Sequence, residues 1–323
     1  MIRALSLTGP TASGKTSLSL FLAEELDCEI ISCDSMQIYR EMNIGTAKAT
    51  AGEQARAKHH MIDILSPSES YSAEDYRRDA MAAAEDITAR GKLPLFVGGT
   101  GLYIDTVMRG GSVESPPSDE NIRTELMRQG ETPEGRERLY ERLSEIDPEA
   151  AEKTHMNNLR RVVRALEIYE VSGKTKTYFD KLSREVSPDV SVGMITLDFH
   201  NRENLYRRVD ARVDEMIDMG LVDEVRSLYE RGLLDPSTTA AQAIGYKEIV
   251  TYIKGECSLV EAVDELKLSS RRYAKRQLTW FRHESDAQRL YVDRVDGSLK
   301  DIDTLSKEAL DAARVLLSRE VKL

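Results

Sequence analysis

The stretch Gly9-Pro10-Thr11-Ala12-Ser13-Gly14-Lys15-Thr16 decides the fold, because it fits the phosphate-binding pattern G-x-x-x-x-G-K-[ST]. A β-like apolar run at residues 2–7 precedes it, and a helical pattern over residues 15–26 follows it. In this context the glycines let backbone N–H groups surround phosphate oxygens, and the helix N-terminus adds the positive end of its dipole. Lys15 then supplies a cation, and the Thr16 hydroxyl supplies a ligand for Mg²⁺. The pattern predicts a phosphate-binding P-loop; the alternative is a glycine-rich turn with a solvated lysine.

Further apolar runs follow at residues 29–33, 61–65, 93–97 and 192–197, and residues 73–90 have a helical pattern. Strands that alternate with helices indicate a parallel sheet covered on both faces. We therefore expect an α/β fold with a P-loop NTPase-like parallel sheet flanked by helices.

Proline- and serine-rich segments at residues 115–118 and 187–189 bracket a stretch without any strand pattern. Residues 116–189 read as short, highly charged helices, which predicts an inserted all-helical subdomain. Residues 1–115 and 190–323 are then expected to form the P-loop catalytic core. From residue 201 onward nearly all of the sequence has helical periodicity, including residues 205–219 and 259–281, so the core is expected to end in helices.

Composition restricts the class of protein. The 323 residues are 41% hydrophobic and carry a net charge of -11, and no apolar run is long enough to cross a bilayer. The three cysteines, Cys28, Cys33 and Cys257, lack the spacing of a zinc site or of a disulfide framework. We expect a cytoplasmic, monomeric protein without a membrane partner. The negative charge argues against indiscriminate nucleic-acid binding.

Two basic clusters nevertheless interrupt this acidic chain. One consists of Arg160, Arg161 and Arg164. The other runs from Arg271 to Arg282 and contains no acidic residue, and its members are Arg271, Arg272, Lys275, Arg276 and Arg282, with Tyr273, Trp280 and Phe281 interleaved. Such a run is typical of a nucleic-acid contact, but an ordinary solvated helix face explains it equally well.

Asp34 directly follows the second predicted strand. In a parallel sheet its carboxylate is therefore expected at the carboxyl edge, beside the P-loop. There it can orient a magnesium-bound water or accept a proton from an attacking nucleophile. The alternative is that Asp34 only caps a helix starting at Ser35.

Two other features are expected near the same edge. Gly98-Gly99-Thr100-Gly101 follows the strand at residues 93–97 and places Thr100 in the same crevice, although a plain strand-to-helix turn also explains these glycines. Arg208 and Arg212 lie four residues apart in a helical pattern, so both guanidinium groups can reach a diphosphate together. Surface arginines paired with acidic residues are the alternative.

Several runs together closely resemble the bacterial tRNA isopentenyltransferase family, also called tRNA dimethylallyltransferases. The matches follow one another along almost the whole chain: the P-loop, then residues 31–39 (ISCDSMQIY), 42–48 (MNIGTAK), 71–73 (YSA), 97–103 (VGGTGLY), 164–167 (RALE), 245–247 (GYK) and 274–282 (AKRQLTWFR). Some eukaryotic relatives append a zinc finger, and the absence of a C-terminal Cys/His set here fits the bacterial form.

The resemblance implies transfer of a dimethylallyl group from dimethylallyl diphosphate to the exocyclic amine of the adenosine 3′ of the tRNA anticodon. The products are isopentenyladenosine and diphosphate, and Mg²⁺ assists. The P-loop then holds the donor diphosphate, and no phosphoryl group moves. Asp34 is implied to accept the proton of the amine, while Lys15, Thr16, Arg208 and Arg212 stabilise the leaving diphosphate.

Chemistry on a base amine also requires that the base leave its stack, which is less costly in an anticodon loop than in a duplex. The resemblance implies contacts with the tRNA anticodon stem-loop from Asp34, Ser35, Met36, Gln37, Thr100, Arg123, Arg160, Arg161, Val162, Val163, Arg164, Gln242, Ala243, Ile244, Gly245, Tyr246, Lys247, Arg272 and Arg276. The run from Arg271 to Arg282 is expected to face backbone phosphates.

Two other functions share the P-loop. A small-molecule or nucleotide kinase would use it to bind ATP, but no clear arginine-rich lid occurs in the kinase position. A non-catalytic RNA-binding protein or nucleotide switch is the second alternative, and no N-K-x-D guanine-reading motif is present.

Overall fold

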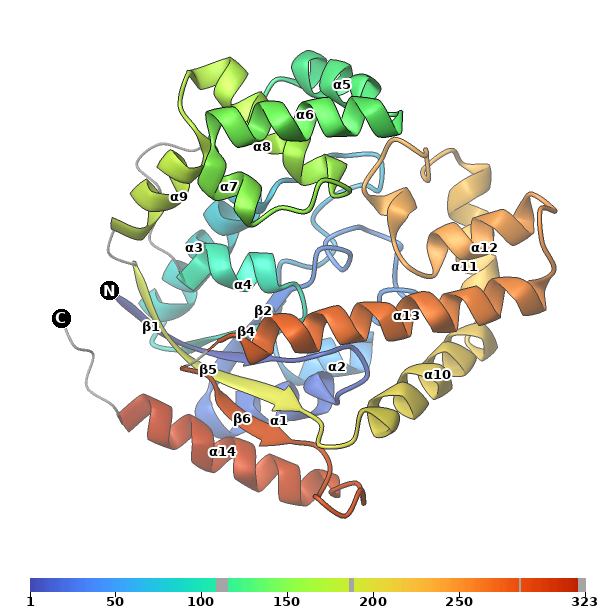
Figure 1. Ribbon diagram of the computed structural model, residues 1–323. Helices are drawn as coiled ribbons and strands as arrows, with labels where there is room; N and C mark the ends of the chain where they lie inside the picture. The colour runs from blue at the N-terminus through green and yellow to red at the C-terminus, as the bar shows by residue number, and fades with distance from the viewer. Residues whose placement is uncertain (109–115, 186–188, 285, 319–323) are drawn as a thin grey trace. The chain divides into compact units, whose positions relative to one another are not determined.

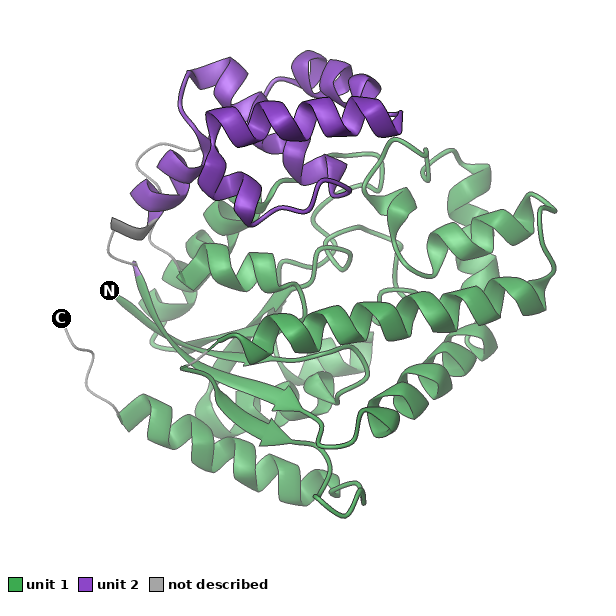
Figure 2. Cartoon of the chain, viewed as in Figure 1, with its two compact units in different colours: residues 1–108, 190–323 green, residues 109–189 purple. Residues whose placement is uncertain are grey.

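The computed structural model describes residues 1–108, 116–185, 189–284 and 286–318, and it divides into two compact units (Figure 2). One unit comprises Met1–Met108 and Val190–Leu323, and the other comprises Arg109–Asp189. No helix among the described residues is long and apolar enough to span a membrane.

The first unit is built on a six-stranded sheet with the order β3-β2-β4-β1-β5-β6, in which every neighbouring pair is parallel (Figure 1). The strands are β1 (Ile2–Thr8), β2 (Cys28–Cys33), β3 (His59–His60), β4 (Leu93–Gly98), β5 (Val190–Asp198) and β6 (Gln288–Tyr291). β1 lies in the middle, with Leu7 level with Val97 of β4 and with Ile195 of β5. The carboxyl ends of the central strands therefore meet at one edge.

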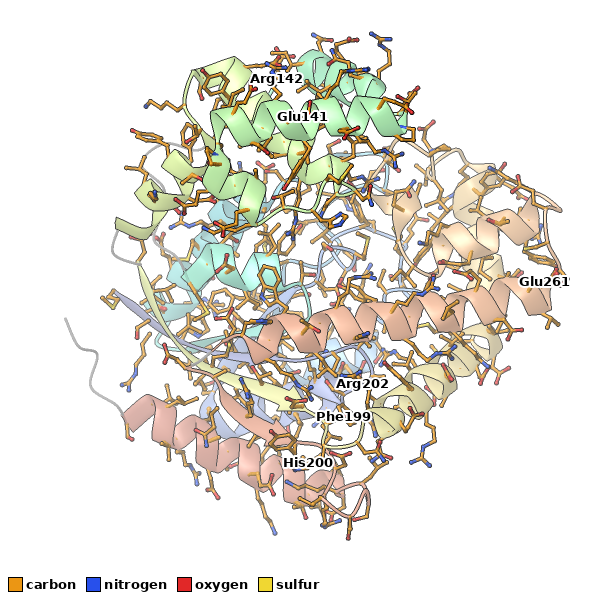
Figure 3. The ribbon with its side chains drawn as sticks, viewed as in Figure 1. Glu141, Arg142, Phe199, His200, Arg202 and Glu261 are labelled. Carbon is orange, nitrogen blue, oxygen red and sulfur yellow. The ribbon has the colours of Figure 1, made fainter. Side chains whose placement is uncertain are left out.

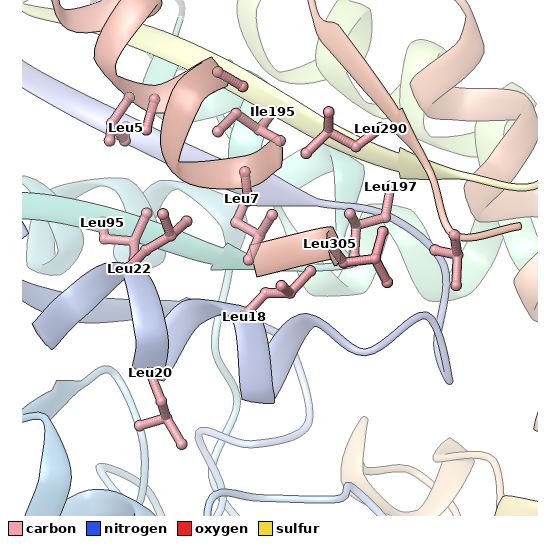
Figure 4. Packing of buried hydrophobic residues seen from close by; sticks show 14 of the residues in the cluster. Leu5, Leu7, Leu18, Leu20, Leu22, Leu95, Ile195, Leu197, Leu290 and Leu305 are labelled. Atoms are coloured by element: carbon pink, nitrogen blue, oxygen red, sulfur yellow. The ribbon is translucent and has the colours of Figure 1, made fainter. Parts of the chain in front are cut away.

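Helices cover both faces of this sheet, because successive side chains of a strand point to opposite sides. Leu5 and Leu7 of β1 pack with α1 (Lys15–Leu26) and α14 (Ile302–Ser318), as the leucine cluster of Figure 4 shows. Ala4 packs on the other face with α3 (Ala73–Ala89) and α4 (Gly101–Met108). A fully buried leucine contributes roughly 1.5–3 kcal/mol, so the two layers are the main source of stability.

A second group of helices follows β5. Phe199 and His200, labelled in Figure 3, lie just beyond the strand and lead into α10 (Arg202–Asp218). Next come α11 (Leu221–Glu230), the short 3₁₀ helix η1 (Ala240–Gln242), α12 (Tyr246–Ile253) and α13 (Leu259–Arg282). These helices enclose a separate core around Tyr246 that also takes in Ile38 and Met42 from the loop after β2. The remaining helix of this unit is α2 (Ala51–Arg56).

The second unit contains only helices among its described residues: α5 (Glu120–Gln129), α6 (Pro133–Ile146), α7 (Pro148–Glu152), α8 (Leu159–Ser172) and α9 (Lys176–Glu185). It has a core of its own, in which Leu126, Leu143 and Leu166 are buried. Side-chain caps such as Thr132 Oγ1, which accepts the Gly135 N–H, set the helix starts.

The predicted fold class, a parallel sheet flanked by helices, is confirmed, but two local predictions are wrong. Residues 61–65 do not form a strand, because Met61 and Asp63 have positive φ values of 62° and 55° that interrupt an extended backbone. The alternative in which Asp34 only caps a helix starting at Ser35 is excluded, since residues 35–38 form turns. β6 lies in the region after residue 201 that was expected to be almost entirely helical. This short strand has only Leu290 and Tyr291 as large apolar residues, so its strand pattern is weak.

Candidate functional site

The loop between β1 and α1 curls tightly around the end of the Lys15 side chain. Gly9 and Gly14 have φ values of 143° and 98°, which glycine adopts without steric cost. A Cβ atom on Gly9 would lie 2.9 Å from the carbonyl oxygen of Leu197, so the backbone approach also requires glycine there. Lys15 Nζ donates hydrogen bonds to the carbonyl oxygens of Gly9 (3.0 Å) and Pro10 (2.7 Å). The ammonium group thus has neutral acceptors here.

Two arginines of α10 lie beside this site, Arg208 at the loop and Arg212 within electrostatic reach of Lys15. Arg208 Nε donates a hydrogen bond to the carbonyl oxygen of Ala12 at 2.7 Å. Arg212 Nε is buried and has no hydrogen-bond partner among the described residues. Burial lowers the pKa of both guanidinium groups. Burial, with the charge of Arg212 next, lowers the pKa of Lys15 to about 7, while Asp34 acts in the opposite direction. The site therefore concentrates positive charge that an anion would stabilise.

Asp34 lies in the turn after β2, within electrostatic reach of Lys15. Its Oδ1 atom accepts the N–H of Met36 at 2.9 Å, which fixes the carboxylate in a turn rather than at a helix start. Burial raises the pKa of Asp34, whereas the Met36 hydrogen bond and the Lys15 charge lower it. A half-buried carboxylate with a raised pKa is a better proton acceptor than a solvated one.

The Gly98–Gly101 turn packs directly against the Asp34 turn. A Cβ atom on Gly98 would lie 2.2 Å from the carbonyl oxygen of Cys33, so only glycine allows this approach. Thr100 donates its N–H to that same oxygen at 3.1 Å. Thr100 Oγ1 in turn accepts the N–H of Ser35 at 3.2 Å. The close contact between the two turns therefore requires glycine at position 98. The hydrogen bond to Thr100 holds Ser35, the residue after Asp34, in place.

Gln277 of α13 joins the P-loop to this turn, and the sequence reasoning missed it. Its Oε1 atom accepts the Thr11 N–H at 2.8 Å, and its Nε2 atom donates to the Gly99 carbonyl oxygen at 3.0 Å. The residue is 5% exposed. The sequence pointed to Gln277 only through its position in the run at residues 274–282, which resembles the family. A glutamine in a helix does not by itself indicate a functional role.

The basic side chains of α13 differ in their partners, and two of them form ion pairs within the fold, so the expectation that the run faces phosphate stays a prediction. Arg271 pairs with Asp210 of α10 at 2.6 Å. Arg282 pairs with Asp198 at the end of β5 at 2.6 Å, and the Asp198 side chain is 2% exposed. These two arginines therefore anchor the helix to the core. Arg282 is nevertheless exposed, as are Arg272, Lys275 and Arg276.

The polar groups of Gln37 are occupied within the fold. Its Oε1 atom accepts the hydroxyl of Ser32 at 2.9 Å, and its Nε2 atom donates to the carbonyl oxygens of Thr46 and Ala47. Gln37 thus connects the Asp34 turn with the loop at residues 42–48. The tRNA contacts expected from Ser35, Met36 and Gln37 stay predictions.

Residues 242–247 include a buried anchor for that loop. The Tyr246 hydroxyl donates to Glu224 Oε1 at 2.6 Å, and the Glu224 carboxylate also accepts the backbone N–H groups of Asn43, Ile44 and Gly45. A Cβ atom on Gly45 would lie 2.5 Å from the Tyr246 ring. The residues that expose side chains here are Gln242 and Lys247; Ala243, Gly245 and Tyr246 are buried, and Ile244 is half-buried.

In the helical unit, most residues expected to contact tRNA are engaged internally. Arg123 and Arg164 both pair with Glu167, whose side chain is fully buried, at 3.0 Å. Val162 and Val163 lie in the core, so the expectation that their side chains contact tRNA is at odds with their burial. Arg160 and Arg161 are exposed.

Comparison with known proteins gives one consistent family. The family model for IPP transferase matches residues 37–284. A tRNA dimethylallyltransferase of Bacillus anthracis is 48% identical over 292 residues, which is 90% of each chain. One of Geobacillus thermodenitrificans is 49% identical over 279 residues, covering 86% of this chain and 87% of the relative.

Solved structures give the same result. The full-length tRNA isopentenylpyrophosphate transferase of Bacillus halodurans is 41% identical, with a TM-score of 0.72 over 98% of this chain and 97% of that one. A eukaryotic dimethylallyltransferase acting on tRNA is 29% identical, with a TM-score of 0.81 over 100% of this chain and 81% of that one.

Proposed function

Because the chain belongs to the IPP transferase family, we propose that its P-loop binds the diphosphate of a prenyl donor and that its Asp34 turn receives an adenosine of tRNA. The enzyme is a tRNA dimethylallyltransferase, as its relatives are. The observation that carries the assignment of the site is the meeting of Lys15, Arg212 and Asp34 within mutual electrostatic reach. One site then contains both the cations that stabilise the leaving diphosphate and the carboxylate that accepts a proton from the nucleophile.

On the donor side, we propose that dimethylallyl diphosphate binds to the P-loop. Arg212 Nε and the Ser13 hydroxyl are both buried without a partner among the described residues, and leaving such groups unpaired is unfavourable. Diphosphate oxygens would accept hydrogen bonds from both. Rupture of the allylic C–O bond leaves negative charge on these oxygens, and Lys15, Arg208 and Arg212 stabilise that charge as it develops.

The residues at this site also fit Mg²⁺, although no cluster of His, Cys, Asp and Glu side chains suited to a metal occurs among the described residues. Mg²⁺ commonly takes few protein ligands and completes its shell with water and substrate phosphates. The Thr16 hydroxyl at the start of α1 would hold it. When bound, the ion would neutralise part of the diphosphate charge.

On the acceptor side, the exocyclic amine of adenosine is a weak nucleophile because its lone pair is delocalised into the ring. Asp34 accepts a hydrogen bond from this amine and takes one of its protons as the nitrogen forms its bond to the allylic carbon. Thr100 supports the same turn through Ser35. We place the acceptor adenosine immediately 3′ of the anticodon, where a base can leave its stack at little cost.

The tRNA backbone is proposed to contact the exposed basic side chains, chiefly Arg272 and Arg276 on α13 and Arg160 and Arg161 on α8. These contacts position the substrate without reading its sequence. We propose that the enzyme acts on tRNA as a monomer in the cytoplasm.

One experiment tests the whole assignment. Purified enzyme is incubated with Mg²⁺, dimethylallyl diphosphate and unmodified tRNA, and the nucleosides are analysed by mass spectrometry. We expect isopentenyladenosine in amounts that match the diphosphate released. Unmodified adenosine together with transfer of the γ-phosphate of ATP would instead support a kinase. Unmodified adenosine with tight tRNA binding and no turnover would support an RNA-binding protein.

A further inference from the structure

The side-chain amide of Gln277 bridges two loops that the proposed mechanism assigns to opposite reactants. Its oxygen accepts the Thr11 N–H from the P-loop at 2.8 Å. Its nitrogen donates to the Gly99 carbonyl oxygen at 3.0 Å. The P-loop faces the leaving diphosphate, and the turn that contains Gly99 supports Asp34. One side chain, 5% exposed, therefore spans both halves of the site.

The bridge leaves little space for adjustment. A Cβ atom on Gly99 would lie 2.1 Å from Gln277 Nε2, so the glycine backbone and the amide are in close contact. A carboxamide carries a donor and an acceptor at its tip, which a carboxylate or a thioether does not. Both groups are used here, each by a different loop. The chemistry of this position is therefore matched to glutamine.

The bridge continues towards Asp34. The turn that Gln277 contacts at Gly99 continues with Thr100. Thr100 Oγ1 accepts the N–H of Ser35, the residue after Asp34. Gln277 is thus linked to the Asp34 turn by its hydrogen bond to Gly99, by the peptide bond from Gly99 to Thr100, and by the hydrogen bond between Thr100 and Ser35.

The helix that carries Gln277 is itself fixed on both sides of this residue. Arg271 pairs with Asp210 of α10, the helix that also provides Arg208 and Arg212. Arg282 pairs with the nearly buried Asp198 beyond Gln277. The amide is therefore presented from a rigid element, which is what accurate placement of two loops requires.

We propose that Gln277 is a positioning residue that sets the separation between the diphosphate-binding loop and the Asp34 turn. The inference rests on the proposed function. With the bridge in place, the allylic carbon of the donor meets the adenosine amine at bonding distance. Without it, each loop still binds its own reactant, but the two reactants are held less accurately together.

The test compares Gln277→Met, which removes both hydrogen bonds, with Gln54→Met as a matched control. The Gln54 amide donates to the Ala49 carbonyl oxygen at 2.7 Å and has no hydrogen bond to either loop among the described residues. Small misplacement of reactants costs on the order of 100-fold in rate, so we expect kcat of Gln277→Met to fall by about that factor. The Kd values of inorganic diphosphate and of tRNA should stay within roughly threefold of wild type. Gln54→Met should keep the wild-type kcat.

A second variant separates positioning from folding. Gln277→Glu keeps an acceptor for Thr11, but its carboxylate faces the Gly99 carbonyl oxygen until it is protonated. Burial raises the pKa of such a carboxyl group, so kcat relative to wild type should recover as the pH falls from about 8 to about 6. Unchanged kcat in Gln277→Met, equal losses of kcat and of both affinities, or no pH-dependent recovery in Gln277→Glu would each overturn the proposal. Wild-type enzyme that forms no isopentenyladenosine would instead refute the proposed function.

Discussion

Diphosphate binding should be coupled to proton uptake by Lys15. The free enzyme holds this lysine with a pKa of about 7, because its ammonium is buried and Arg212 is close. Above that pH the free enzyme is mostly neutral at Lys15. A bound diphosphate brings negative charge to the ammonium and raises its pKa, so binding takes up a proton. Affinity should therefore decrease as the pH rises above about 7.

The size of the effect follows from the pKa. One pH unit above the pKa of about 7, roughly a tenth of the free enzyme carries the charged lysine, which costs binding about 1.4 kcal/mol. The Kd of inorganic diphosphate should thus rise about fivefold from pH 7 to pH 8 and about ninefold from pH 8 to pH 9, until the pKa of the bound form is reached. The same shift predicts uptake of about half a proton per diphosphate at pH 7, rising to about one between pH 8 and pH 9.

Isothermal titration calorimetry in buffers of different ionisation enthalpy measures both quantities. Lys15→Arg is the control, because an arginine stays protonated throughout this range. Its binding should take up only the protons that diphosphate itself requires, and its Kd should rise with pH only by the amount linked to those protons. Wild-type enzyme whose proton uptake and Kd follow those of Lys15→Arg would refute the reasoning.

Three other outcomes are expected. Asp34→Asn should lower kcat for transfer by about 10²- to 10⁴-fold, as loss of a general base does, with little change in the Kd of inorganic diphosphate; single-turnover nucleoside analysis checks this. Arg272→Glu combined with Arg276→Glu should weaken tRNA binding and flatten the slope of log Kd against log salt, and equal slopes in filter binding would count against a phosphate contact. Gly99→Ala should destabilise the fold by roughly 1–3 kcal/mol in urea unfolding, because its Cβ atom would meet Gln277 Nε2 at 2.1 Å.

Local patterns predicted much of this architecture. The helical pattern at residues 15–26 coincides with α1, and the runs at residues 2–7, 29–33, 93–97 and 192–197 lie within β1, β2, β4 and β5. These segments are buried on both sides of the sheet, so their continuous apolar sequence is a strong signal. The placement of Asp34 beside the P-loop also followed, because consecutive parallel strands end at the same edge.

Contacts between segments that lie far apart in the sequence could not be predicted from any local pattern. The division of the α13 arginines between ion pairs and solvent depends on Asp198 and Asp210, which lie far away in the sequence. The bridge made by Gln277 depends likewise on two loops that the sequence alone does not bring to α13. A basic run therefore indicates that charge is present, but only the packing of the helix decides which charges are available.

The order of strands also affects how the chain can fold during synthesis. β1 is made first, yet its neighbour β5 is separated from its other neighbour β4 by residues 99–189. At roughly 5–20 residues per second, that stretch takes on the order of ten seconds to translate. During this interval one edge of β1 has no strand to pair with. Unpaired strand edges favour association between chains. Nascent chains stalled before Val190 should therefore depend on chaperones more than chains released after it.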